Sequence, residues 1–216
     1  MISLFELNSK SEVNKEFRVR DILKIIDADK EIKKEAKVIE KILLKNVITK
    51  DTFNIKSDEC CKEIYIFYIE LSSRDIPINF IKSFDKAIEL HTYFIFRYQE
   101  EIKELCIYRY IENKNIIRKD VFFSDWIKEK KEEKELPFCI TVKEVYDNLI
   151  YNLLELKPRD REKLNDYIER YKSIKKLKKE IEVLQNKAFK EIQPKKKFAI
   201  KDEMSNKKKI LRNLER

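Results

Sequence analysis

The chain has 216 residues, of which 49 are Lys or Arg and 40 are Asp or Glu, and its formal net charge is +9. It contains no glycine, so it cannot form the glycine-rich phosphate loops of P-loop NTPases, dinucleotide-binding proteins or protein kinases. Its single histidine, His91, excludes HExxH and other two-histidine zinc sites. We therefore expect no cofactor, no metal and no nucleotide-driven chemistry.

The positive charge is concentrated at one end of the chain. Residues 157–216 contain 21 Lys and Arg against 10 Asp and Glu, a net charge of +11. The remaining 156 residues contain 28 basic and 30 acidic side chains, a net charge of −2. This asymmetry predicts two parts, a near-neutral body at 1–156 and a basic arm at 157–216, and any attraction to phosphate is expected in the arm.

The first third of the chain favours one long helix. Residues 11–17 lack a clear period, whereas apolar residues recur at intervals of three and four across 29–47, with Asp29 as an N-cap. That spacing predicts an amphipathic helix with its buried face at Ile32, Ala36, Ile39, Leu43 and Val47. Residues 52–56 favour a short strand.

The middle of the chain predicts a sheet. Residues 64–71 are apolar on both strand faces, which is typical of a strand covered on both sides. A helix over 77–90 and strands over 91–99, 104–112 and 120–127 follow, the first of these strands parallel to 64–71 through a right-handed crossover. We expect a hairpin between the strands at 91–99 and 104–112.

The C-terminal part is predicted to be helical. Residues 128–136 are a charged loop or frayed helix, and 142–156 form an amphipathic helix. Further along, a heptad seam is followed by Pro194 and a last helix at 198–215, with Lys207 in its seam. The expected fold is therefore α/β (α+β), a central mixed sheet of about four strands flanked by helices, with a C-terminal helical hairpin or coiled-coil arm.

Cysteine usage and hydropathy indicate a cytoplasmic protein. The spacing of Cys60, Cys61, Cys106 and Cys139 fits neither paired zinc ligands nor a secreted disulfide framework, so reduced thiols are expected. The N-terminus lacks the pattern of a signal peptide, and no uncharged apolar run is long enough to span a membrane.

Several segments together resemble a known family. VNKEF, LLKNVITKDTFNI, EIYIFYIEL, FIKSFDKAIELHTYFIF and the Lys/Glu heptad tail occur in this order. They resemble an uncharacterised bacterial family, a domain of unknown function that accompanies type III restriction–modification methyltransferase and helicase genes. The chain has Glu89 and Leu90 where that family has a proline and an aromatic residue. The resemblance implies a setting in phage defence or DNA modification, and no reaction.

Glu70 is the strongest candidate for a catalytic carboxylate. Restriction-type nucleases hold Mg²⁺ between an acid on one strand and a Glu-x-Lys on the next, where the lysine positions water. Glu70 ends the predicted central strand, and Asp51 or Asp58 would be the earlier acid. The lysine position holds Ser72, and Arg74 lies two places too far along and is a poor proton acceptor.

Structural roles compete with each of these candidates. Glu70 also fits a strand-end carboxylate paired with Arg74 or Lys62, and His91 fits either a general base or a helix–strand junction. A set of strand aromatics fits either sheet packing or a base-stacking face: Tyr93, Phe94, Phe96, Tyr98, Tyr108 and Tyr110. Trp126 is expected to be a packing anchor.

The arm carries the binding residues that we expect. Clustered lysines would contact DNA without reading its sequence: Lys175, Lys176, Lys178, Lys179, Lys195, Lys196, Lys197, Lys207, Lys208 and Lys209. Four seam residues would bind a partner helix or a second copy: Ile174, Leu177, Ile181 and Leu184. We expect a non-catalytic accessory component of a restriction–modification or phage-defence system that docks a methyltransferase or helicase subunit. The alternative is a metal-dependent nuclease of degenerate restriction-endonuclease-like fold.

Overall fold

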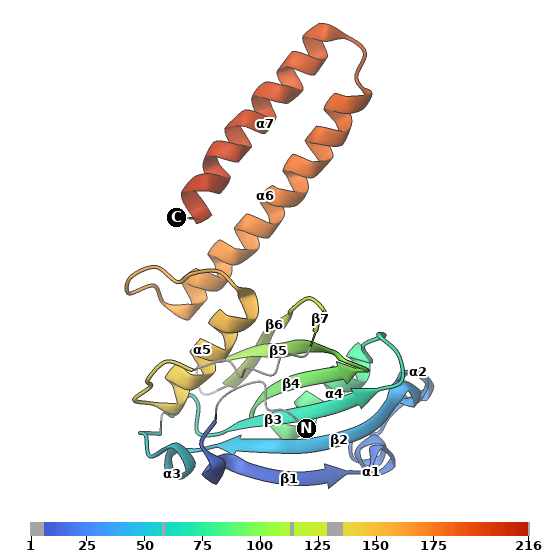
Figure 1. Cartoon of the computed structure of the whole chain (residues 1–216), viewed down its shortest axis with the longest axis vertical. Coiled ribbons are helices and arrows are strands. Elements are labelled where there is room, and N and C mark those ends of the chain that lie inside the picture. The colour runs from blue at the N-terminus through green and yellow to red at the C-terminus, as the bar shows by residue number, and fades with distance from the viewer. Residues whose placement is uncertain (1–6, 58, 113–114, 129–135, 216) are drawn as a thin grey trace. The chain divides into compact units, whose positions relative to one another are not determined.

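The computed structural model of the chain describes residues 7–57, 59–112, 115–128 and 136–215, with 110–112 and 115–119 as backbone only. The chain divides into two compact units, Met1–Leu154 and Glu155–Arg216. The first contains a multi-strand sheet with helices, and the second is helical (Figure 1). The predicted α/β class with a C-terminal helical arm is confirmed.

The sheet is larger than the expected four strands. Its described strands follow the order β1-β2-β3-β4-β5-β6, with β7 paired to β5. Every pairing is antiparallel except β3 with β4, which are parallel as predicted. The strands are β1 (Glu12–Phe17), β2 (Ile39–Ile48), β3 (Ile64–Leu71), β4 (His91–Tyr98), β5 (Glu101–Glu112), β6 (Asn115–Phe123) and β7 (Ile127–Lys128).

The core forms around β3 because that strand is apolar on both faces. The predicted crossover helix is α4 (Ile78–Ile88), which connects β3 to β4. Phe67 of β3 stacks on Phe94 of β4 with ring centroids 5.6 Å apart, and Phe84 of α4 meets Phe67 edge-on at 5.0 Å. Alternating side chains of β4 therefore point to opposite faces, with Phe94 toward α4.

The predicted helix over 29–47 is wrong beyond its first turns. Asp29 does cap α2 (Lys30–Glu35), its Oδ1 accepting a bond from the Ile32 amide at 2.8 Å, but η2 (Ala36–Val38) ends the helix and β2 follows. Register shifts lie at Ile39/Lys41 and Leu44/Asn46. Because a bulge adds one residue to a period of two, the apolar spacing of a bulged strand imitates the three-and-four spacing of a helix.

One further local prediction needs correction. Residues 52–56 are not a strand, because Thr49 and Thr52 form a capping box that starts α3 (Lys50–Phe53), and Asn54 ends it in the left-handed region at φ 53°. Residues 11–17, for which the sequence predicted no element, comprise the end of η1 (Ser9–Ser11) and the edge strand β1, and α1 (Val19–Ile25) follows. The loop predicted at 128–136 falls mostly outside the described residues.

The helix predicted at 142–156 is α5 (Val142–Leu154). It packs on the sheet face opposite α4, where the ring of Tyr146 meets the ring of His91 edge-on at 4.5 Å. Val145, Leu149 and Leu153 are buried there, as the spacing predicts.

The second unit is a helical hairpin of α6 (Leu164–Lys190) and α7 (Pro194–Glu215), drawn in orange and red in Figure 1. Pro194 is the first residue of α7. Proline is tolerated there because the backbone N–H groups of the first turn have no partner within the helix. The last helix therefore begins four residues before the predicted start at 198.

Candidate functional site

The proposed catalytic carboxylates do not come together. Ile48 pairs with Ile64 at the start of β3, and Asp51 follows Ile48 closely on α3, whereas Glu70 lies at the other end of β3. At about 3.3 Å per strand residue, Glu70 and Ile64 are about 20 Å apart. Asp51 and Glu70 therefore cannot bind one ion together, and Asp58 lies outside the described residues.

Glu70 has a different ion partner from the expected ones. Its Oε1 lies 3.8 Å from Nη1 of Arg97 on β4, and Lys41 is opposite it on β2. Arg74 instead pairs with Glu101 at 2.5 Å. The expectation that Arg74 or Lys62 would pair with Glu70 is therefore replaced by Arg97.

Glu70 lines a cleft of about 410 Å³ at the carboxyl ends of the parallel strands β3 and β4. Ligands of open α/β sheets commonly bind at such an edge. The bulge on β2 places a second carboxylate, Glu40, in the same cleft, and Ser72, Arg97 and Tyr98 contribute to its wall. Sequence reasoning missed Glu40 because it assigned that residue to a helix. Among the described residues, no group of three or more His, Cys, Asp and Glu side chains is arranged to hold a metal ion.

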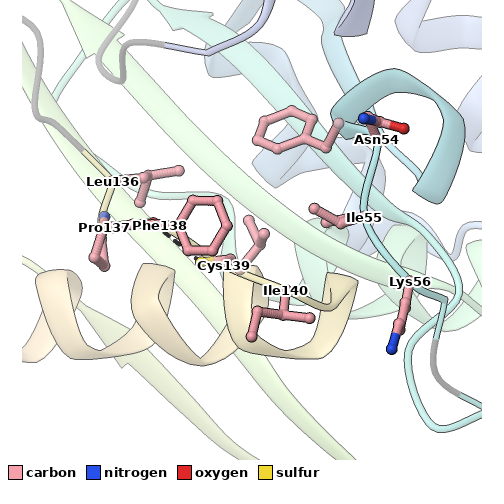
Figure 2. Close-up of a pocket in the computed structure, with 10 residues that line it drawn as sticks. Asn54, Ile55, Lys56, Leu136, Pro137, Phe138, Cys139 and Ile140 are labelled. Atoms are coloured by element: carbon pink, nitrogen blue, oxygen red, sulfur yellow. Dashed lines mark hydrogen bonds between the residues drawn. The ribbon is translucent and has the colours of Figure 1, made fainter.

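A second, apolar pocket of about 640 Å³ lies between α3 and the segment before α5, and Figure 2 shows its lining. Phe53, Ile55, Phe138 and Ile140 form much of its wall. The Cys139 thiol in this wall donates to the Pro137 carbonyl at 3.1 Å. The lining offers apolar surface without a set of titratable groups, so it does not indicate a reaction.

His91 is held as a neutral side chain. It is 9% exposed, and burial, followed by the charges of Arg109 and Lys143, lowers its pKa to about 4. A nearby thiol is no nucleophile at neutral pH, because burial raises the pKa of Cys106 to about 12. His91 therefore has a structural role, in which its buried ring packs against Tyr146.

The body also contains a buried polar network that the sequence did not reveal. The Arg109 guanidinium of β5 forms an ion pair with the Asp85 carboxylate of α4, and the Thr92 hydroxyl of β4 donates to the same carboxylate. On the other side, the Tyr146 hydroxyl accepts from the Arg109 amide at 3.3 Å. Asp85 lies beside Phe84 on the buried face of α4. A carboxylate at a predicted core position of this helix is the sequence signal that could have indicated the network. The network joins α4, β4, β5 and α5.

Four of the six strand aromatics are buried and therefore closed to nucleic-acid bases. Tyr93, Phe94 and Phe96 are fully buried, and Tyr108 is buried. Tyr98 is half-buried in the cleft wall, and the side chain of Tyr110 is outside the described part of the chain. Trp126 packs against the core as expected.

The apolar seam of α6 is covered inside the hairpin. Ile174, Ile181 and Leu184 are buried, and Leu177 is half-buried. The neighbour of α6 in this unit is α7, which supplies the return helix that a short heptad seam needs. A partner helix at this seam would have to displace α7.

Ion pairs hold the two helices of the hairpin together. The buried Arg170 guanidinium of α6 donates to the Glu162 carboxylate at 2.7 Å and to the Leu214 carbonyl of α7 at 2.9 Å. Lys207, the charged residue of the α7 seam, reaches Glu180 of α6 at 2.7 Å. The hydrogen bond between them lowers the pKa of Glu180 and raises the pKa of Lys207.

Most of the ten arm lysines remain outside these pairs. Lys207 pairs with Glu180, Lys178 pairs with Glu215 at 2.8 Å, and the Lys175 ammonium lies 4.9 Å from the centre of the Tyr171 ring. Within the described residues the other seven form no ion pair: Lys176, Lys179, Lys195, Lys196, Lys197, Lys208 and Lys209. The hairpin therefore presents uncompensated positive charge to solvent.

The hairpin also exposes large apolar side chains. Val183 and Ile210, on the helices away from the turn, are each 52% exposed. At the turn, Phe189 is 87% exposed, Ile192 is 91% exposed and Phe198 is 67% exposed. Three of these five side chains lie within residues 189–198, and exposed apolar groups that form a contiguous patch are typical of an interaction surface.

Comparison with known proteins identifies a family without an assigned function. The chain belongs to the family described as Domain of unknown function (DUF4391), whose model matches residues 5–211. This confirms the resemblance to a domain of unknown function. No curated protein and no solved structure matches the chain. No helix in the described part of the chain is long and apolar enough to cross a membrane.

Proposed function

We propose that the chain is a non-catalytic accessory component of a bacterial restriction–modification or phage-defence system, which docks a partner subunit and DNA through its helical hairpin. The observation that carries this proposal is the hairpin exterior, where seven lysines that form no ion pair with any described residue accompany exposed apolar side chains. The genetic setting comes from the resemblance to a family that accompanies type III methyltransferase and helicase genes. The partner would supply the nucleotide-dependent chemistry for which this chain lacks glycine-rich loops.

The contact with a partner protein is assigned to the hairpin exterior, since α7 already covers the seam. Val183 and Ile210 are the exposed apolar side chains on the helices and are the positions to test. The full chain would be co-expressed with a type III methyltransferase and helicase from the same genome, the partners that the resemblance implies. Val183→Asp combined with Ile210→Asp is expected to reduce copurification at least tenfold, because charge in an apolar contact is strongly unfavourable. Val13→Asp, at a comparably exposed apolar position of β1, is the matched control. Equal recovery of wild type and the hairpin variant would contradict the assignment.

The alternative function, a metal-dependent nuclease, is favoured by one observation. Glu40 and Glu70 line the same cleft, so a pair of carboxylates is available without Asp51. The proximity of Arg97 to Glu70 works against it, because a bound cation would share the site with a guanidinium. Plasmid cleavage with Mg²⁺ or Mn²⁺ decides: cutting that is lost in both Glu70→Gln and Glu40→Gln would overturn the non-catalytic proposal.

A further inference from the structure

The turn of the hairpin combines a high density of lysines with exposed apolar side chains. Residues 187–201, called the hairpin tip below, contain six lysines and one glutamate. Three of their apolar side chains, Phe189, Ile192 and Phe198, are among the most exposed large hydrophobics in the described part of the chain. These side chains make little contact within the hairpin, so they contribute little to its stability.

We propose that the hairpin tip binds nucleic acid whose base faces are exposed, as in a single strand or an unpaired segment. This inference deepens the proposed function and rests on the DNA contact proposed there. Lysine ammonium groups attract phosphates in single and double strands alike. Phenylalanine rings gain most by stacking on a base face, and in an intact duplex those faces are covered by neighbouring bases. The tip therefore adds a preference for unstacked bases to a general attraction to phosphate.

The distribution of charge favours a polyanion over a lipid surface. Lys179 and Lys208 lie ten residues from Phe189 and Phe198, respectively. At 1.5 Å per residue that is about 15 Å along each helix. A membrane that met the tip end-on would leave these lysines beyond the screening length of about 8 Å at physiological salt. A nucleic-acid strand can follow the helices and meet the tip and these lysines together.

The arrangement of the tip lysines also favours nucleic acid over an acidic patch on a folded protein. Lys195, Lys196 and Lys197 are consecutive at the start of α7, so their side chains point about 100° apart around the helix. A flat acidic surface can reach only one side of that helix. A flexible strand can bring phosphates to several sides while a base contacts the rings.

The test measures fluorescence anisotropy of the full chain with a labelled oligothymidine strand and with a labelled duplex of equal length. Phe189→Ser combined with Phe198→Ser is expected to weaken single-strand binding by about tenfold or more, because stacking contributes about 5- to 150-fold per base. Its effect on duplex binding is expected to be less than twofold. The control is Val13→Ser combined with Ile25→Ser, which removes two exposed apolar groups of the body and should leave single-strand binding unchanged. Both variants are checked for helix content by circular dichroism.

Three outcomes would overturn the inference. The first is equal weakening of single-strand and duplex binding by the phenylalanine changes, or no weakening of either, which would leave the DNA contact of the proposed function standing. The second is the absence of binding to both probes, which would remove that contact as well. The third is tighter phenylalanine-dependent binding to polyglutamate, or to vesicles of equimolar phosphatidylcholine and phosphatidylserine, than to the single strand. Tighter binding to polyglutamate would assign the tip to a protein partner, and tighter binding to the vesicles would assign it to a membrane.

Discussion

Removing the Asp85 carboxylate should destabilise the body more than any surface change. In Asp85→Ala the Arg109 guanidinium, 2% exposed, loses its ion partner and the Thr92 hydroxyl loses its acceptor. Breaking one half of a buried ion pair costs about 3–5 kcal/mol, since the remaining charge is buried without compensation. For a protein of this size, about 2–4 °C per kcal/mol corresponds to a fall in melting temperature of about 6–20 °C.

The single tryptophan allows this loss to be assigned to the body. Trp126 packs against the sheet core, so its fluorescence during urea unfolding reports on the first unit and not on the hairpin. Replacing both partners, Asp85→Leu with Arg109→Met, should recover most of the free energy of unfolding because no unpaired charge remains. Glu16→Gln is the control, since its ion pair with Lys41 is at the surface and such pairs contribute at most about 1 kcal/mol. A loss below about 1 kcal/mol in Asp85→Ala, or no recovery in the double variant, would refute the assignment of a stabilising buried pair.

Three further predictions concern titration, packing and thiol access. The folded-state pKa of His91, about 4, lies below its unfolded value near 6.5, so the unfolded state binds the proton first and about 3 kcal/mol of stability is lost as the pH falls from about 6.5 to 4. In His91→Phe the free energy of unfolding, measured by urea titration, should depend less on pH between these values, and an unchanged pH dependence would contradict the assignment. Ile181→Ala should destabilise the hairpin by about 2–5 kcal/mol and half-buried Leu177→Ala by less, as followed by far-ultraviolet circular dichroism; the reverse order would contradict the seam geometry. Exposed Cys60 should react with a thiol reagent in the native protein, whereas buried Cys106 should react only after unfolding, and equal rates for the two would contradict the burial.

The sequence predicted best where one period held over a whole element. The strand at 64–71 is apolar on both faces, and the crossover helix and the hairpin seam repeat without interruption, so each was predicted correctly. The prediction was wrong at β2, because two bulges disturb the strand period of two. The β-branched residues of this segment favour a strand, but its three-and-four spacing indicated a helix. Local capping chemistry at Thr49 also decided α3 against the strand-like composition of the residues that follow.

The candidate sites show the same division between local and long-range information. The lysines and the seam follow from local sequence and lie on the hairpin as predicted. The cleft depends on a bulge that brings Glu40 beside Glu70, and the buried network depends on residues more than twenty positions apart, Asp85 and Arg109. A single sequence holds no direct signal for such pairings, since they are made by strand register. The tip aromatics Phe189 and Phe198 were visible in the sequence, but only their exposure distinguishes them from seam residues.

The salt dependence of duplex binding by the full chain tests the central claim, that the hairpin makes the associations through the seven lysines that form no ion pair among the described residues. Each phosphate contact contributes about −0.9 to the slope of log K against log salt, so up to seven lysines predict a slope between about −3 and −6. Lys176, Lys179, Lys208 and Lys209 changed together to Gln should make that slope shallower by about 2–4. Changing Lys33 and Lys34, exposed on α2 of the body, should leave it unaltered. An unaltered slope in the hairpin variant, or an equal reduction in the body variant, would contradict the account.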